Sequence, residues 1–351
     1  NSYGVAPCPG IPRGRITQLY GNAGAGKTTL ALTVAAGVCA RGGTVVYIDW
    51  ENEVEPRYAA ALGVPIEDAS RFVLLQPETL EQGMKAMIIM ASEGVDLIVV
   101  DSVGAGTPSD FYNREVDKEG DFGRMGLVAQ KWSVFLPKFK SILSRSNTAL
   151  IGISQLRKTM NGMGMGPDSA PQGGEAWKFY SSVRIMLRVF SKENGKVLNG
   201  VTGKVEEMPT GAVVKVKLEK CKVSDSVHQE QKFYLRSGTG IDNTRSVVDL
   251  ALAYGVLTKS GSYYGWGTAP GGEIRVQGVD ALLKTLSSDP RLVPALFAAV
   301  MPKLNALAAA PPSDLGEEEA SGEGLDPAEL DDLFKTVGGS DAIPDAAPEE
   351  D

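Results

Sequence analysis

Gly21-Asn-Ala-Gly-Ala-Gly-Lys-Thr28 lies between a strand-like segment, 15–20, and a helix-like segment, 30–40. Glycines in such a turn let several backbone N–H groups point inward at phosphates, and the following helix adds the positive end of its dipole. Lys27 is expected to reach the outer phosphates, and Thr28 to offer a hydroxyl to Mg²⁺. A plain glycine-rich turn is the alternative, which the complete pattern disfavours. The expected nucleotide contacts are Gly21, Asn22, Ala23, Gly24, Ala25, Gly26, Lys27, Thr28 and Thr29.

Short β-branched runs alternate with helix-like segments through the first half of the chain. The expected strands are 15–20, 44–49, 72–76, 97–101 and 148–154. This alternation predicts an α/β fold, with a mainly parallel twisted sheet flanked by helices on both faces. Three later runs, 183–190, 212–221 and 231–236, are separated by turn residues such as those at 193–195 and predict an antiparallel extension of the same sheet.

Composition divides the chain into three expected parts. Residues 1–242 form the α/β core, and a glycine-containing stretch at 237–243 marks its end. Residues 243–308 predict a small α/β domain, with a helix at 245–254, an aromatic hairpin near 263–266 and two helices between 278 and 308, the second opening with Asp289-Pro290. Residues 309–351 hold too little apolar surface to offset the entropy of ordering, so we expect a disordered tail.

The charge distribution separates the tail from the body. Of the total net charge of −8, residues 313–351 carry −13 and residues 1–312 carry +5. A mobile acidic segment can compete with nucleic acid for a basic surface. The alternative is a tail that only increases solubility. The turn at 326–334 is a candidate docking site for a partner such as a loader or a single-strand-binding protein, or a transient helix without a partner.

Several classes of protein are disfavoured by composition. The longest apolar runs, 97–100 and 149–153, fall far short of the roughly 18 residues that a membrane span needs. Cys8, Cys39 and Cys221 are odd in number and far apart, which favours a reducing compartment over a disulfide scaffold. A single histidine, His228, excludes a histidine-rich metal site. We expect a cytoplasmic protein with no membrane partner.

Two carboxylates follow apolar strands at the expected edge of the sheet. Asp101 ends the run 97–101, where it would hold Mg²⁺ through water, opposite Thr28. Glu51 follows the strand 44–49 and is placed to activate the water that attacks the terminal phosphate. For Glu51, a solvated residue at a strand end is the alternative reading when the motif is taken alone.

In their residues and in their order along the chain, these motifs resemble those of the bacterial RecA family of homologous-recombination ATPases, from about residue 10 to residue 303. The matching runs are 9–15 (PGIPRGR), 47–51 (YIDWE), 55–59 (EPRYA), 62–64 (LGV), 99–103 (VVDSV), 125–127 (MGL), 146–148 (SNT), 155–157 (QLR), 173–174 (GG) and 178–184 (KFYSSVR). The small second domain and the acidic tail are similar to those of the family as well. The chain is divergent, as a viral or otherwise distant member would be.

The resemblance implies roles for individual side chains around an ATP molecule. Glu51 becomes the general base, Tyr58 the ring that stacks on adenine, and Glu55 its neighbour beside the base. Gln155 becomes the sensor of the terminal phosphate, since an amide can hydrogen-bond a phosphate oxygen or the attacking water. Lys220 and Lys222 match a pair that reaches the ATP of the adjacent subunit, and residues two apart on a strand share one face. A solvated basic strand is the alternative for this pair.

Two long segments are candidate DNA-binding loops, 113–126 and 156–174. Irregular segments of this length inside a compact domain are usually functional or disordered. Basic side chains would neutralise phosphates, methionines would wedge between bases, and glycines would let the backbone follow the strand. A mobile surface loop is the alternative. The resemblance places DNA contacts here, and those expected are Arg124, Met125, Gly126, Arg157, Lys158, Met160, Gly173 and Gly174.

The chain also departs from the family. Gln130 and Pro137 stand at positions that are usually basic, and we expect Lys131, Lys138 and Lys140 to compensate. The family's N-terminal helix and strand, which pack on an adjacent subunit, have no counterpart in the sequence. Assembly is instead expected from the matching interface residues, Lys178 and Phe179.

These observations predict an ATP-dependent DNA recombinase that forms filaments on single-stranded DNA and pairs it with homologous double-stranded DNA. The expected cofactors are ATP and Mg²⁺, and the expected partners are both forms of DNA and further copies of the chain. The compartment would be the bacterial cytoplasm, or the host cytoplasm for a viral protein. A hexameric helicase-like motor and a non-catalytic recombination mediator remain alternatives.

Overall fold

The computed structural model describes residues 10–112, 120–158, 169–198, 203–223 and 230–308. The expected acidic tail, Cys8, His228 and the candidate DNA contact Met160 lie outside these residues. Within them, no helix is both long enough and apolar enough to cross a bilayer.

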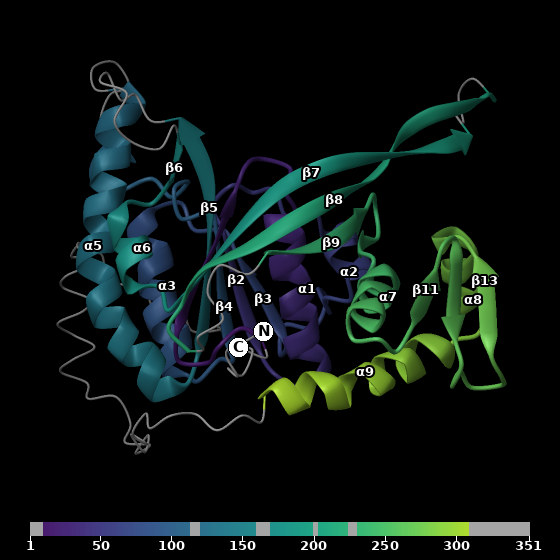
Figure 1. The fold of residues 1–351 in the computed structure, drawn as a ribbon. Helices are drawn as coiled ribbons and strands as arrows, with labels where there is room; N and C mark the ends of the chain where they lie inside the picture. Colours follow the sequence, from purple (N-terminus) through teal and green to yellow (C-terminus); the bar gives the residue numbers. More distant parts are fainter. Residues whose placement is uncertain (1–9, 113–119, 159–168, 199–202, 224–229, 309–351) are drawn as a thin grey trace, which may run out of the picture.

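A ten-stranded sheet forms the centre of the molecule (Figure 1). Its order is β10-β9-β8-β7-β1-β5-β4-β2-β3, with β6 paired to β5. Strands β1 to β5 and the start of β7 are parallel, and β7 to β10 continue as an antiparallel extension, so the predicted fold class is confirmed. The strands are β1 (Ile16–Gly21), β2 (Val45–Asp49), β3 (Phe72–Leu75), β4 (Leu97–Asp101), β5 (Ala149–Lys158), β6 (Ser169–Pro171), β7 (Val183–Leu198), β8 (Val205–Cys221), β9 (Glu230–Arg236) and β10 (Gly240–Ile241).

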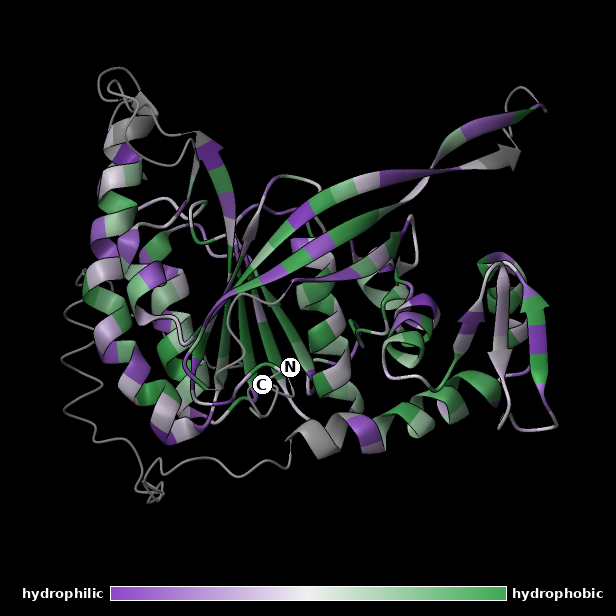
Figure 2. Cartoon of the chain, in the orientation of Figure 1, coloured by the Kyte–Doolittle hydropathy of each residue, from purple (hydrophilic) through white to green (hydrophobic). Residues whose placement is uncertain are grey.

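Helices cover both faces of the parallel part of the sheet. Figure 1 shows α3, α5 and α6 on one face and α1 and α2 on the other. Both faces of β2 and β4 are therefore buried, which explains why these strands are almost wholly apolar (Figure 2). The helices are α1 (Lys27–Ala40), α2 (Pro56–Ala61), α3 (Leu80–Ser92), α4 (Ser109–Tyr112), α5 (Gly120–Ser146) and α6 (Glu175–Tyr180).

The residues after 242 form a smaller unit with an apolar core of its own. Leu257, Trp266, Leu282 and Leu296 are buried in this core. Its elements are α7 (Asn243–Ala253), β11 (Thr258–Ser260), β12 (Tyr263–Trp266), β13 (Ile274–Gln277), α8 (Val279–Ser288) and α9 (Leu292–Ala308). The expected second helix, α9, starts at Leu292, and the Asp289-Pro290 pair lies directly before it, where the Asp289 carboxylate accepts a hydrogen bond from the amide of Arg291 at 2.9 Å. The three domain boundaries stay a prediction.

Helix α5 begins inside the first segment that we predicted to be a loop. Residues 120–126 are helical, and 113–119 lie outside the described residues. Val128, Trp132 and Phe135 are spaced along one face of α5 and pack against α3 and the sheet. The helix continues from this apolar stripe toward its N-terminus, so residues 120–126 are helical and not irregular as predicted.

The second predicted loop begins and ends as a two-stranded ribbon. Leu156 pairs with Pro171, Arg157 with Ala170 and Lys158 with Ser169. Strand β5 thus continues beyond the sheet into this ribbon without a break. The prediction of irregular chain over 156–174 is wrong for 156–158 and 169–171, which are strands, and right for 172–174, while 159–168 fall outside the described residues.

Strands β7 and β8 extend past the sheet as a long arm (Figure 1). The turn expected at 193–195 is wrong, because β7 runs through it to Leu198. The register shift between Glu193 and Asn194 is a β-bulge whose extra residue, Thr210, lies on β8. Arg245 of α7 forms an ion pair with Glu193 at 2.7 Å, which ties the base of the arm to the smaller unit.

Candidate nucleotide and DNA site

The phosphate loop connects the end of β1 to the start of α1. Gly24 and Gly26 have φ angles of 72° and 79°, in the left-handed region where a side chain would strain the backbone. This conformation turns the chain sharply into the helix, which starts at Lys27. The first-turn amides of a helix lack intrahelical acceptors, so those of Lys27 and Thr28 are available to an anion. The loop therefore fits a phosphate group.

Lys27 lies inside the curve of this loop. Its side chain is buried, and Nζ donates hydrogen bonds to the carbonyl oxygens of Gly21 at 3.2 Å and Asn22 at 2.9 Å. Burial lowers the pKa of Lys27, while the carboxylates of Asp101 and Glu51 oppose that shift. An ammonium group held by two weak neutral acceptors can exchange them for phosphate oxygens, which are stronger partners.

Thr28 and Asp101 meet at the carboxyl edge of the sheet. Thr28 Oγ1 donates to Asp101 Oδ2 at 2.7 Å, and the Tyr47 hydroxyl donates to the same oxygen at 2.7 Å. In the described part of the chain, no cluster of three or more His, Cys, Asp or Glu side chains could hold a metal ion. Mg²⁺ in a nucleotide site keeps several waters and takes few protein ligands, so a hydroxyl and one carboxylate fit that ion.

Glu51 is held between two neighbouring strands. Gln155 Nε2 lies 3.1 Å and 3.2 Å from its two carboxylate oxygens, and the Ser102 hydroxyl donates to Glu51 Oε1. Glu51 follows β2, Ser102 follows β4 and Gln155 lies on β5, so the sheet order itself brings them together. Ser102 was not predicted as a site residue, although its place directly after Asp101 was the available signal.

Tyr58 lies on helix α2, and Glu55 is the residue that caps the start of this helix. The Tyr58 hydroxyl lies 2.9 Å from Thr29 Oγ1, which places the phenol ring beside the start of α1. Glu55 is exposed and caps α2 by accepting a hydrogen bond from the amide of Arg57 at 3.3 Å. The structure thus brings Tyr58 to the loop, whereas it gives Glu55 a helix-capping contact.

Lys220 lies away from the chain's own phosphate loop. It pairs with Arg184 near the start of β7, at the level of Gln18 in the middle of β1 and two strands away from it, whereas the loop follows Gly21 at the end of β1. Its Nζ donates to the carbonyl oxygens of Lys178 at 2.7 Å and Phe179 at 3.0 Å, the end of α6. Burial lowers the pKa of Lys220, and the charge of Lys222 adds to that effect. The Phe179 ring is 76% exposed and stands beside this group.

The candidate DNA residues gather where α5 begins and the β5–β6 ribbon leaves the sheet. Arg157 Nη1 lies 3.7 Å from the sulfur of Met125, and Arg124 Nη1 donates to the carbonyl of Ala105 at 3.2 Å. Gly126 is exposed on the same turn of α5. Gly173 and Gly174 have φ angles of 94° and 85°, and Gly174 caps α6. Of Lys158 only the backbone is described, as part of the ribbon.

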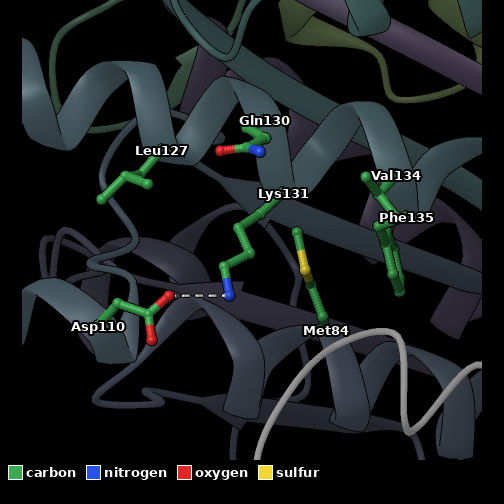
Figure 3. Close-up of a pocket in the computed structure, with 7 residues that line it drawn as sticks. All are labelled: Met84, Asp110, Leu127, Gln130, Lys131, Val134 and Phe135. Carbon is green, nitrogen blue, oxygen red and sulfur yellow. Dashed lines mark ion pairs between the residues drawn. The ribbon is translucent and has the colours of Figure 1, made fainter.

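Lys131 does not replace the missing basic residues, contrary to our prediction. Figure 3 shows it pointing from α5 toward α4, next to a cavity of about 230 Å³. Its Nζ lies 3.0 Å from Glu81 of α3 and 3.2 Å from Asp110 of α4. The two carboxylates outweigh burial and raise the pKa of Lys131. Glu81 is almost fully buried, so its charge requires this partner.

Lys131→Met is expected to destabilise the protein by about 2 kcal/mol, because it leaves the buried charge of Glu81 unpaired. This destabilisation is smaller than that expected for breaking a fully buried ion pair, because about a quarter of the Lys131 side chain is exposed. Urea unfolding measures the change. The double variant Glu81→Gln/Lys131→Met should recover most of the loss, and equal instability of single and double variants would contradict this assignment.

Asp101→Asn is expected to stabilise the nucleotide-free protein. Burial raises the pKa of Asp101 to about 6, from an ordinary value of 3.8. A raised carboxyl pKa means that ionisation costs folding stability, and the cost grows as pH rises from about 4 to about 6. Removing the charge of Asp101 therefore adds up to about 3 kcal/mol to the free energy of unfolding at neutral pH. Asparagine still accepts the two hydrogen bonds from the hydroxyl groups of Thr28 and Tyr47.

Thermal unfolding at neutral pH and near pH 4 tests this expectation. The melting temperature of Asp101→Asn should exceed that of the wild type at neutral pH, and the difference should vanish near pH 4. Asp68→Asn is the control, because hydrogen bonds from Ser70 lower the pKa of this exposed carboxyl group. A destabilised Asp101→Asn protein at neutral pH would refute the argument.

Comparison with known proteins agrees with this geometry. A family model described as the RecA N-terminal domain matches residues 4–242. The curated relatives include Protein RecA of Thermus thermophilus, 36% identical over 312 residues, which covers 88% of this chain and 84% of that protein. Protein RecA of Methylococcus capsulatus is 35% identical over 319 residues (90% and 85%), and that of Aquifex pyrophilus is 40% identical over 278 residues (78% and 74%). Because the match spans most of both sequences and includes every element of the nucleotide site, the chain belongs to the RecA family.

Proposed function

We propose that this chain holds Mg²⁺ and ATP at its phosphate loop and uses their hydrolysis to change its grip on single-stranded DNA. As a RecA-family protein it is an ATP-dependent DNA recombinase and a DNA-dependent ATPase. This membership favours the recombinase over the hexameric motor and over the non-catalytic mediator. The ligands, the residue roles and the partners named below are proposals.

One observation carries the proposal. Gln155 contacts the carboxylate of Glu51, and the next three residues of the same strand form the ribbon that leads to the second candidate DNA segment. A side chain that changes its partner when phosphate arrives would therefore move the start of that ribbon. ATP and DNA would then both shift the position of strand β5. A structural element that responds to both ligands is the requirement for thermodynamic coupling between two sites.

In the proposed reaction, water attacks the terminal phosphorus of ATP and the bond to the leaving ADP oxygen breaks. Glu51 accepts the proton of this water, while Ser102 and Gln155 hold its carboxylate in place. Lys27 neutralises charge on the outer phosphate oxygens. Bound Mg²⁺, held by Thr28 and by Asp101 through water, would supply charge stabilisation at the phosphates. Tyr58 would stack on adenine, with Glu55 beside it.

The second half of the ATP site is proposed to come from a neighbouring copy of the chain. Lys220 and Lys222 lie far from the chain's own loop, at a surface that also presents the exposed ring of Phe179 and the side chain of Lys178. A surface that meets a different surface on the next copy gives an open helical assembly when the rotation does not close. We therefore propose a filament with one ATP at each interface.

The proposed partners are single-stranded DNA, homologous double-stranded DNA and further copies of the chain. Arg124, Met125, Gly126, Arg157, Lys158, Met160, Gly173 and Gly174 are the proposed DNA contacts. The acidic residues 313–351 are proposed to bind a loader or single-strand-binding protein. The proposed compartment is the bacterial cytoplasm.

Phosphate release by the purified chain, with and without single-stranded DNA, tests the proposed function. We expect DNA to stimulate release, and electron micrographs of the same sample to show open filaments on the DNA. Closed rings with directional unwinding would instead support a helicase-like motor. ATP binding without any phosphate release would support a mediator.

A further inference from the structure

A chain of polar side chains, buried except for its last member Glu219, crosses four neighbouring strands of the sheet, from β5 through β1 and β7 to β8. Gln18 Nε2 donates to Ser154 Oγ at 2.9 Å, and Arg184 Nε donates to Gln18 Oε1 at 2.8 Å. Arg184 Nη1 then lies 3.6 Å from Glu219 Oε2. Ser154, Gln18 and Arg184 are 0%, 1% and 8% exposed, so solvent does not satisfy them.

Tyr20 also belongs to this network, because its ring contacts the guanidinium group of Arg184. Arg184 lies 4.7 Å from the centre of the Tyr20 ring, in cation–π contact. Burial and a hydrogen bond to Glu219 raise the pKa of the Tyr20 hydroxyl, so it stays protonated and donates to that carboxylate. Glu219 is thus held both by the guanidinium and by the phenol.

Such a network is not explained by stability alone. Burying a charged guanidinium group carries a large desolvation cost, and apolar residues of similar volume often stabilise a protein equally well or better. What a fully paired network does provide is a fixed relation between the groups at its ends, because its side chains are locked by several partners at once.

Each end of the network is one residue away from a group in the proposed ATP machinery. Ser154 precedes Gln155, which contacts Glu51 in the chain's own site. Glu219 precedes Lys220, which is proposed to enter the site of the next copy, and Tyr20 precedes Gly21, where the phosphate loop starts. Within one chain, the network therefore connects Gln155 and the phosphate loop, which belong to the chain's own ATP site, with Lys220, which is proposed to enter the ATP site of the next copy.

We infer that Arg184 is a positioning residue that couples consecutive ATP sites along the assembly. With Gln18 it transmits the position of Gln155, set by the chain's own nucleotide, to the strand that carries Lys220. Occupancy of one site then biases the placement of the lysine in the next. The inference rests on the proposed function, since it needs an ATP site that is shared between copies.

The test is the dependence of ATP hydrolysis on ATP concentration at saturating single-stranded DNA. In the wild type we expect sigmoidal dependence, and in Arg184→Met a Hill coefficient of about 1 with single-stranded DNA binding retained. Arg184→Lys keeps the charge and one partner, so it should restore part of the cooperativity. Arg15→Met, which replaces an exposed arginine just before β1, is the matched control and should behave as the wild type.

The outcomes separate this inference from the proposed function. If single-stranded DNA does not change the rate of ATP hydrolysis by the wild type, the proposed function is refuted without any variant. A wild type with DNA-stimulated but non-cooperative hydrolysis would leave that function intact and overturn the coupling. Unchanged cooperativity in Arg184→Met would overturn it as well. Should Arg184→Met not fold, Gln18→Met decides in its place, since it breaks the network while Arg184 keeps Glu219; cooperativity must fall there too.

Discussion

Glu51→Gln is expected to lower ATP hydrolysis on single-stranded DNA by about 10²–10⁴-fold, the usual contribution of a general base. Glutamine retains the shape of the side chain and still accepts the hydrogen bonds of Ser102 and Gln155, but it cannot take the proton from water. ATP and DNA binding should therefore survive. Steady-state phosphate release and nucleotide binding, measured on the same preparation, check both parts of the expectation.

Glu53→Gln is the matched control for this experiment. Glu53 is an exposed carboxylate two residues further along the same loop, and its amide variant should hydrolyse ATP at the wild-type rate. Wild-type hydrolysis by Glu51→Gln would remove Glu51 from the reaction. Loss of ATP binding in that variant would instead show that the carboxylate supports the structure of the site.

Lys220→Ala is expected to lower DNA-stimulated hydrolysis by about 10²-fold or more, as the loss of a charged group that stabilises the transition state does. Because Lys220 lies outside its own chain's phosphate loop, ATP binding to the isolated chain should be unaffected. The exposed Lys192 lies on the arm, far along β7, and Lys192→Ala provides the control.

Mixing two inactive variants distinguishes a shared site from a site within one chain. Lys220→Ala subunits carry an intact Glu51, and Glu51→Gln subunits carry an intact Lys220. In a random equal mixture about a quarter of the head-to-tail interfaces combine both intact residues, so hydrolysis should reappear. A mixture as inactive as its two components would contradict an ATP site formed between copies.

The sequence was sufficient to predict the parallel core, because glycines, β-branched runs and strand-end carboxylates are local signals. The phosphate loop and the strand ends at Asp101 and Glu51 follow from such signals, and the sheet order brings them together as expected. The roles of these residues and the domain boundaries stay predictions, since their geometry alone does not test them.

Interactions between distant segments were not predictable in the same way. Lys131 was expected to face DNA, but its partners Glu81 and Asp110 lie on other helices, and only packing determines which way the side chain turns. Gln18 and Arg184 are 166 positions apart in the sequence, so no local sequence pattern predicts their contact. The available signs of a buried network were two polar residues inside otherwise apolar runs, Gln18 in β1 and Arg184 at the start of β7.

The arm formed by β7 and β8 shows how a local turn signal can fail. The Glu193-Asn-Gly195 sequence favours a hairpin turn, yet β-formers follow it and pair with the residues before Gly211. The extra residue of the bulge at this point is Thr210 of β8, and Gly195 stays paired with Met208, so β7 continues. Pairing with a distant segment therefore decides where β7 ends.

The affinity for single-stranded DNA in three nucleotide states tests the central claim most directly. Nucleotide at the phosphate loop is proposed to change the position of the β5–β6 ribbon through Gln155. Binding in the presence of a slowly hydrolysed ATP analogue should exceed binding with ADP, or without nucleotide, by about 5–150-fold, the usual range of coupling between two sites. Equal affinity in all three states would contradict the account.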